Sequence, residues 1–143
     1  MAIRIGINGL GRIGRGLLRR SLDDADLVVT AVNDLAPPAT LAHLLRHDSI
    51  YGPLAHEVVA EAEALRVDGR RIPWTGRRVP AEIPWRAAGV DYVVEATGQF
   101  ARREAAAGHL AGGARRVVIS APSPDADVTL CLGVNDASFD PAR

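Results

Sequence analysis

The chain has 143 residues, the usual length of one domain, and 48% of them are hydrophobic, which excludes a disordered chain. Its 17 basic residues are all arginine and are balanced by 17 acidic residues, which argues against nucleic-acid binding and excludes any lysine-based chemistry. The single cysteine excludes an internal disulfide, and no apolar run reaches the length of a membrane helix. We therefore expect one soluble, cytoplasmic domain over residues 1–143.

The first 32 residues predict a strand, a helix and a second strand. Ile3–Asn8 is short, rich in isoleucine and bounded by glycine, as is typical of a buried strand. Residues 15–22 carry apolar side chains at helical spacing with arginines opposite, and residues 27–32 are again continuously apolar. This succession is a β-α-β unit.

The later elements continue the alternation. Pro37 and Pro38 open a second helix, and Trp85 begins a helical turn. Residues 50–80 change to short mixed runs with an Asp68-Gly69 hairpin signal, which predicts an antiparallel insertion. Further strands are expected at residues 92–95, 116–119 and 128–132, and a helix at residues 102–111 that stops at Gly112-Gly113.

Strands that alternate with helices favour an α/β fold of the Rossmann type. We predict a doubly wound, mostly parallel sheet with helices on both faces and the antiparallel insertion around residues 50–80.

A G-x-G-x-x-G motif lies between the first strand and the first helix. Gly9 permits the tight turn, Gly11 lets a pyrophosphate approach the backbone, and Gly14 lets the helix pack closely on the strand. The amides of Arg12 and Ile13 then face the phosphates from the positive end of the helix.

Asp34 ends the second strand, twenty residues after Gly14. A carboxylate there accepts hydrogen bonds from the adenosine ribose and repels a 2′-phosphate, so the position favours NAD over NADP. The alternative is that Asn33 and Asp34 only start a turn and cap the helix that follows.

Two more strand ends carry hydroxyl side chains, Thr97 and Ser120. Because the carboxyl ends of parallel strands share one edge of a sheet, both should lie beside Gly9 and Asp34. Taken one at a time, they are equally compatible with ordinary loop chemistry.

These residues closely resemble the N-terminal domain of glyceraldehyde-3-phosphate dehydrogenase. The matching stretches are residues 5–15, 31–34, 48–49, 92–98, 113–123 and 133–135, in the family's order and spacing. Two positions depart from the family: Leu10 stands where phenylalanine is usual, and Tyr51 stands where histidine is usual.

The resemblance implies an NAD site with the adenosine ribose on Asp34, Arg78 beside the adenine, and Thr97 and Ser120 toward the nicotinamide. The expected cofactor-binding residues are Asn8, Gly9, Gly11, Arg12, Ile13, Gly14, Asn33, Asp34, Arg78, Thr97, Gly98 and Ser120.

No catalytic residue is predicted. The family is about twice as long, and the resemblance places its nucleophilic cysteine and catalytic histidine beyond Arg143. Cys131 falls in the predicted strand at residues 128–132, so we expect a buried, structural thiol. His43 and His47 have metal-ligand spacing but no third ligand nearby, so we predict no metal site.

Two functions remain open. The first is the NAD-binding domain of a phosphorylating glyceraldehyde-3-phosphate dehydrogenase, or of the related erythrose-4-phosphate dehydrogenase, which binds NAD without turnover alone. The second is a stand-alone NAD-binding or regulatory module. The family's tetramer implies a homo-oligomer, and apolar surface that the catalytic half would cover predicts self-association here, such as a non-native dimer.

Overall fold

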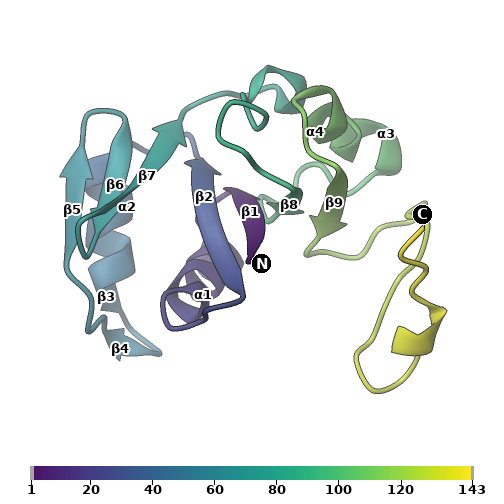
Figure 1. Cartoon of the computed structure of the whole chain (residues 1–143), viewed down its shortest axis with the longest axis horizontal. Coiled ribbons are helices and arrows are strands. Elements are labelled where there is room, and N and C mark those ends of the chain that lie inside the picture. Colours follow the sequence, from purple (N-terminus) through teal and green to yellow (C-terminus); the bar gives the residue numbers. More distant parts are fainter. Residues whose placement is uncertain (1, 143) are drawn as a thin grey trace.

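A seven-stranded sheet runs through the computed structural model, which describes residues 2–142 (Figure 1). The helices and strands in chain order are β1 (Ile3–Asn8), α1 (Arg12–Ser21), β2 (Leu27–Asn33), α2 (Pro38–Arg46), β3 (His47–Asp48), β4 (Gly52–Pro53), β5 (Val58–Glu61), β6 (Ala64–Val67), β7 (Arg70–Thr75), β8 (Tyr92–Glu95), α3 (Arg103–Ala106), α4 (Gly108–Ala111) and β9 (Arg116–Ile119). Two short 3-10 helices complete the set, η1 (Pro80–Glu82) and η2 (Asp136–Ser138).

The strand order β5-β6-β7-β2-β1-β8-β9 is that of a doubly wound sheet. The strands β7, β2, β1, β8 and β9 are parallel, whereas β5, β6 and β7 are antiparallel. The chain moves outward from β1 to β2 and β7, then returns to place β8 on the other side of β1. This reversal is the switch point at which such sheets bind ligands, and the predicted Rossmann-type fold is confirmed.

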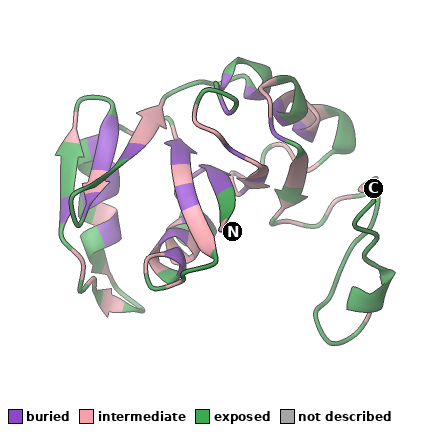
Figure 2. Ribbon diagram, viewed as in Figure 1, coloured by how far each residue is buried: buried purple, intermediate pink, exposed green. Residues whose placement is uncertain are grey.

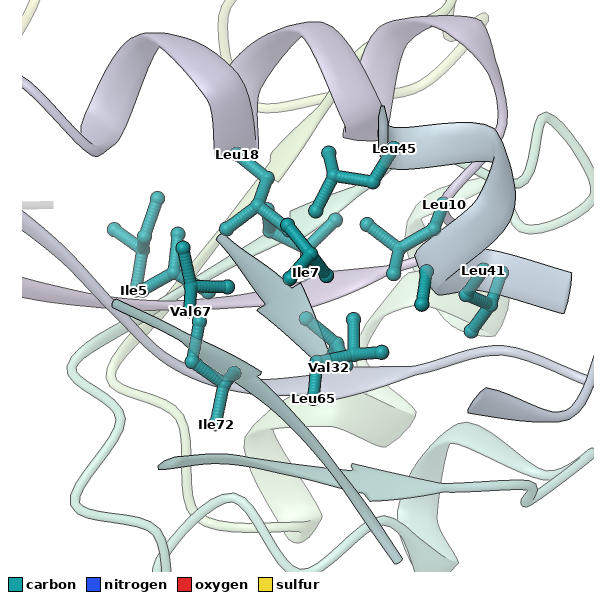
Figure 3. Close-up of a cluster of buried hydrophobic side chains, with 13 residues drawn as sticks. Ile5, Ile7, Leu10, Leu18, Val32, Leu41, Leu45, Leu65, Val67 and Ile72 are labelled. Carbon is teal, nitrogen blue, oxygen red and sulfur yellow. The ribbon is translucent and has the colours of Figure 1, made fainter. Parts of the chain in front are cut away.

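One face of the sheet is covered by α1 and α2. Leu18 of α1 and Leu41 and Leu45 of α2 pack on Ile7 and on the buried side chains of β2, β6 and β7 (Figure 3). Each of these leucines is at most 2% exposed, and burying one such side chain stabilises the fold by about 2 kcal/mol. This cluster anchors α1, and with it the glycine loop.

The opposite face is covered by Trp85, Ile83 and α4. A Cβ on Gly6 of β1 would lie 2.6 Å from the Trp85 ring, so the indole packs directly on the strand backbone. The register of β2 against β1 shifts between Ile5 and Gly6, which leaves Thr30 as an extra residue. Helices and turns therefore cover both faces, as predicted.

The insertion is a pair of hairpins that extends the main sheet. The turn between β6 and β7 is Asp68-Gly69. These residues have φ of +46° and +79°, the left-handed conformation that a two-residue hairpin requires. The end of β7 pairs with β2, so the antiparallel strands continue the parallel ones.

The predicted helix at residues 102–111 is broken into α3 and α4. A Cβ on Gly108 would lie 3.0 Å from the Pro80 Cβ, so the chain approaches η1 at the point where the helix breaks. As predicted, α4 ends before Gly112-Gly113.

The predicted strand at residues 128–132 is wrong, and so is the buried position of Cys131. This segment has no regular structure, and Cys131 is exposed. The side chain of Asn135 bonds the Cys131 amide at 2.6 Å and the Thr129 carbonyl at 2.8 Å, so local bonds replace a sheet ladder. Residues 121–142 form an arm that leaves the sheet and is largely exposed (Figures 1 and 2).

The longest helix among the described residues, α1, has 10 residues, and none of these helices is long and apolar enough to cross a membrane.

Candidate functional site

The glycine loop lies at the carboxyl end of β1, where the two halves of the parallel sheet diverge. Gly9 has φ of +93°, and a Cβ there would lie 2.9 Å from the Thr97 amide nitrogen. A Cβ on Gly14 would lie 2.0 Å from the Gly9 carbonyl oxygen, whereas one on Gly11 would meet nothing within 4 Å. Gly9 and Gly14 thus permit close backbone packing, and the space above Gly11 is open.

The N-terminus of α1 opens onto this space without a side-chain cap. Its N-cap is Gly11, and its first turn contains no acidic residue. Arg12 and Ile13 are exposed. Uncapped amides at the positive end of a helix are an anion site, so this loop can receive a phosphate group.

Asp34 lies beside the loop and bonds to it. One carboxylate oxygen accepts the Leu10 amide at 2.7 Å, and the other accepts the Ala36 amide at 2.8 Å. The N-cap of α2 is Pro37, and no side chain caps that helix. Asp34 therefore starts the turn before α2 but does not cap the helix. Each oxygen retains a lone pair for a further donor, such as a ribose hydroxyl.

The remaining predicted residues follow neighbouring strand ends. Thr97 and Gly98 come after β8, Ser120 comes after β9, and Arg78 comes three residues after β7. The backbone joins these ends, since Ala96 donates to Asn8 at 2.8 Å and Ser120 donates to the Glu95 carbonyl at 3.0 Å. The exposed Arg78 guanidinium makes no hydrogen bond or ion pair within residues 2–142.

Asn8 and Asn33 occupy a different position from the rest of the predicted set. Both are buried, at 2% and 3% exposure, directly below the loop residues that follow them. The side-chain amide group of Asn33 donates to the side-chain Oδ1 atom of Asn8 at 2.8 Å. Both side chains therefore belong to the buried layer beneath the candidate site, which we call its support, and not to its open surface.

Sequence reasoning missed two residues in this support, Glu95 and His109. The Glu95 carboxylate accepts from Asn8 at 2.6 Å and lies 2.8 Å from the His109 Nε2 atom. Burial raises the pKa of Glu95, but the hydrogen bonds from His109, Thr97 and Asn8 outweigh it and hold the pKa below its usual value. A glutamate in an otherwise apolar strand is the signal in the sequence that could have pointed to this cluster.

The other histidines form no metal centre among the described residues. The rings of His43 and His47 lie 4.8 Å apart, but no group of three or more potential ligands is arranged to hold a metal ion in residues 2–142.

A large hollow lies away from the glycine loop. It has a volume of about 1060 Å³ and separates β9 and α3 from the exposed arm. Ser120 and Phe139 are among its lining residues. None of the other predicted cofactor residues lines it, and the strand ends that carry them form an open rim along the edge of the sheet.

Comparison with known proteins agrees with this geometry. Residues 3–103 match the family model described as "Glyceraldehyde 3-phosphate dehydrogenase, NAD binding domain". The chain is 50% identical over 144 residues to glyceraldehyde-3-phosphate dehydrogenase 2 of Streptomyces avermitilis, which covers 100% of this chain and 43% of the relative. It is 54% identical over 139 residues to the Kitasatospora aureofaciens enzyme (96% and 42%) and 48% identical over 141 residues to that of Geobacillus stearothermophilus (99% and 42%). The chain thus spans less than half the length of these relatives.

Proposed function

From the premise that this chain belongs to the NAD-binding domain family of glyceraldehyde 3-phosphate dehydrogenase, we propose that residues 1–143 form one dinucleotide-binding domain with its site on the open rim. NAD is the cofactor of this domain family, and when bound it supplies a hydride acceptor. The domain's own task is to bind and orient it.

The observation that carries the proposal is the packing of the three motif glycines. A side chain on Gly9 or Gly14 would collide with the protein's own backbone, whereas one on Gly11 would enter open space. That space lies at an uncapped helix N-terminus, where a pyrophosphate finds free amides and a favourable dipole. The amides of Arg12 and Ile13 would hold it.

The other predicted residues are assigned to parts of the cofactor from their places along the strand ends. Asp34 would accept the adenosine ribose hydroxyls, and the free guanidinium of Arg78 would lie beside the adenine. Thr97, Gly98 and Ser120 would border the nicotinamide half.

We propose further that the chain is the NAD-binding part of an enzyme that oxidises and phosphorylates an aldehyde. That reaction needs a thiolate nucleophile and a base. Neither role is assigned to any of residues 2–142; Cys131 lies on the exposed arm at residues 121–142. We place this activity in the cytoplasm, in a homo-oligomer, with glyceraldehyde 3-phosphate as the substrate and erythrose 4-phosphate as the alternative. A stand-alone NAD-binding module would use the same rim.

Replacement of Asp34 tests the cofactor site. Asp34→Ala should raise the Kd for NAD about tenfold or more, because it removes a charged acceptor, and should reduce the discrimination against NADP. Isothermal titration calorimetry with both nucleotides measures this. Asp26→Ala is the matched control, since it removes the same charge from an exposed residue at the opposite end of β2. Equal NAD affinity in Asp34→Ala and the native chain would refute the assignment.

A further inference from the structure

A row of buried polar side chains crosses the sheet just below the rim. Asn8 is the Cα partner of Asn33 on one side and of Glu95 on the other. All three are at most 3% exposed, and each directly precedes a rim segment, at Gly9, Asp34 and Ala96. Hydrogen bonds link the three side chains in sequence, 2.8 Å from Asn33 to Asn8 and 2.6 Å from Asn8 to Glu95.

The direction of every bond in this row is fixed from its two ends. At one end the Arg77 backbone amide donates to the side-chain Oδ1 atom of Asn33 at 2.8 Å, so the side-chain amide group of Asn33 must donate to Asn8. At the other end the Trp85 indole, which can only donate, lies 3.0 Å from the His109 Nδ1 atom. His109 is therefore neutral, with its proton on Nε2, and donates to Glu95.

Donors thus converge on Glu95 from both ends. Its carboxylate accepts four hydrogen bonds, from the Asn8 amide group, from His109, and from the amide and hydroxyl of Thr97. Four bonds use the full acceptor capacity of a carboxylate. A network whose two ends both donate needs one member that only accepts, and Glu95 is that member.

The two bonds to Thr97 connect this buried network to the rim. The Thr97 amide lies 2.8 Å from Glu95, and the Thr97 hydroxyl accepts the Gln99 amide at 3.1 Å. A Cβ on Gly9 would lie 2.9 Å from the Thr97 Cγ2 atom, so the loop after β8 packs on the glycine loop. The orientation of Thr97 is therefore set by Glu95.

We propose that Glu95 and His109 are positioning residues for the dinucleotide: they hold the Thr97–Gly98 loop against the glycine loop, in the orientation that receives the half of the dinucleotide beyond the adenosine. This inference rests on the proposed NAD site. Neither side chain touches the cofactor, and both act through Thr97.

The competing explanation is that the network only stabilises the fold. The two explanations differ in which ligand is affected. If the network positions the loop, disrupting it weakens the binding of NAD but not that of AMP. AMP carries only the adenosine half and one phosphate, which in the proposed site are held by Asp34 and the helix N-terminus. A purely structural role changes the melting temperature of the free chain and leaves the ratio of the two affinities unchanged.

The experiment measures the Kd for NAD and for AMP by calorimetry on the 143-residue chain, well below its melting temperature. Thr97→Val removes the hydroxyl bonded to Glu95 but keeps the methyl group that faces Gly9. Thr97→Ser restores the hydroxyl. The matched control is Thr30→Val, because the buried Thr30 hydroxyl has no hydrogen-bond partner among the described residues.

We expect Thr97→Val to raise the Kd for NAD about tenfold, as for a lost hydrogen bond to a charged group, while the Kd for AMP changes less than about threefold. Thr97→Ser should recover NAD binding relative to Thr97→Val, because it regains the hydroxyl, and Thr30→Val should bind both ligands like the native chain. Glu95→Gln and His109→Leu should show the same selective loss. If one of these two variants fails to fold, the other decides, because a loss in Thr97→Val alone also follows from a direct contact of Thr97 with the cofactor.

Equal NAD affinity in Thr97→Val and the native chain would overturn the inference, as would a parallel loss of NAD and AMP binding. If the native chain itself fails to bind NAD, the proposed function fails instead, so the two failures are distinguishable.

Discussion

Glu95 is the one acidic side chain among the buried residues of the described chain, at 1% exposure. A buried charge is costly unless hydrogen bonds replace its hydration. Here Thr97, Asn8 and His109 supply them, and the donor-only indole of Trp85 fixes the histidine tautomer. Stability and site geometry therefore depend on the same carboxylate.

The lowered pKa of Glu95 predicts a pH dependence with a definite sign. Burial raises that pKa, and the hydrogen bonds from His109, Thr97 and Asn8 lower it by more, so the folded value lies below the ordinary 4.5. The carboxylate thus stabilises the fold above about pH 4.5, and this contribution is lost as the pH falls through the folded pKa.

Thermal unfolding from about pH 7 to about pH 3 tests this. Because other carboxylates also titrate there, the quantity of interest is the difference between the native chain and Glu95→Gln. That difference in melting temperature should shrink toward acid pH. A difference that stays constant over the range would contradict the assigned sign.

At the scale of elements, the strand–glycine loop–helix unit is the part most fully predictable from the sequence. The motif, the apolar run of β1 and the alternating face of α1 are local signals, and the Asp68-Gly69 hairpin is another. The break between α3 and α4 was not predicted; it lies where Gly108 approaches Pro80, a residue far away in the chain.

The three glycines of this unit predict three different outcomes on replacement by alanine. Gly14→Ala should destabilise the fold by about 1–3 kcal/mol, because its Cβ would lie 2.0 Å from the Gly9 carbonyl oxygen. Gly16→Ala, in the same helix with nothing within 4 Å, should stabilise it by up to about 1 kcal/mol. Gly11→Ala should leave the free energy of unfolding unchanged but weaken NAD binding, because its Cβ would enter the open space above the loop.

Urea unfolding and NAD titration of the three variants separate these effects. Gly16 is the internal control, since it experiences the same helix without the close contact. A Gly14→Ala variant as stable as the native chain would show that α1 does not pack on the Gly9 carbonyl as described.

At the scale of the whole molecule, the arm at residues 121–142 is where sequence reasoning fails. Val128, Leu130 and Leu132 alternate like a strand, yet they are 41%, 43% and 90% exposed. Alternation predicts a strand only where a sheet edge pairs with it. Here the bonds of Asn135 hold a local turn instead, and a pattern in the sequence does not show which partner a segment finds. The candidate site shows the same limit: Asn8 and Asn33 were predicted to bind the cofactor but are buried, and Glu95 and His109 were missed.

The exposed arm predicts self-association of the 143-residue chain. Leu132 and Val134 are 90% and 79% exposed, and the hollow of about 1060 Å³ beside the arm is lined by further apolar side chains. Apolar surface of this extent favours association. Light scattering over a concentration series should show a rising mean mass, and Leu132→Ser with Val134→Ser should reduce it. Ile50→Ser, at a similarly exposed position on the β3–β4 hairpin, is the control. A strict monomer at high concentration would contradict the prediction.

Thermal unfolding of the native chain with NAD, with NADP and with neither is the most direct test of the open rim as a cofactor site. A ligand at about 100 times its Kd stabilises the folded state by about 2.7 kcal/mol, which is readily measured as a shift in melting temperature. We predict a clear upward shift with NAD and a smaller one with NADP, because the carboxylate of Asp34, in the proposed ribose site, would repel a 2′-phosphate. No shift with either nucleotide would contradict the assignment of the glycine loop and Asp34 as a binding site in this chain.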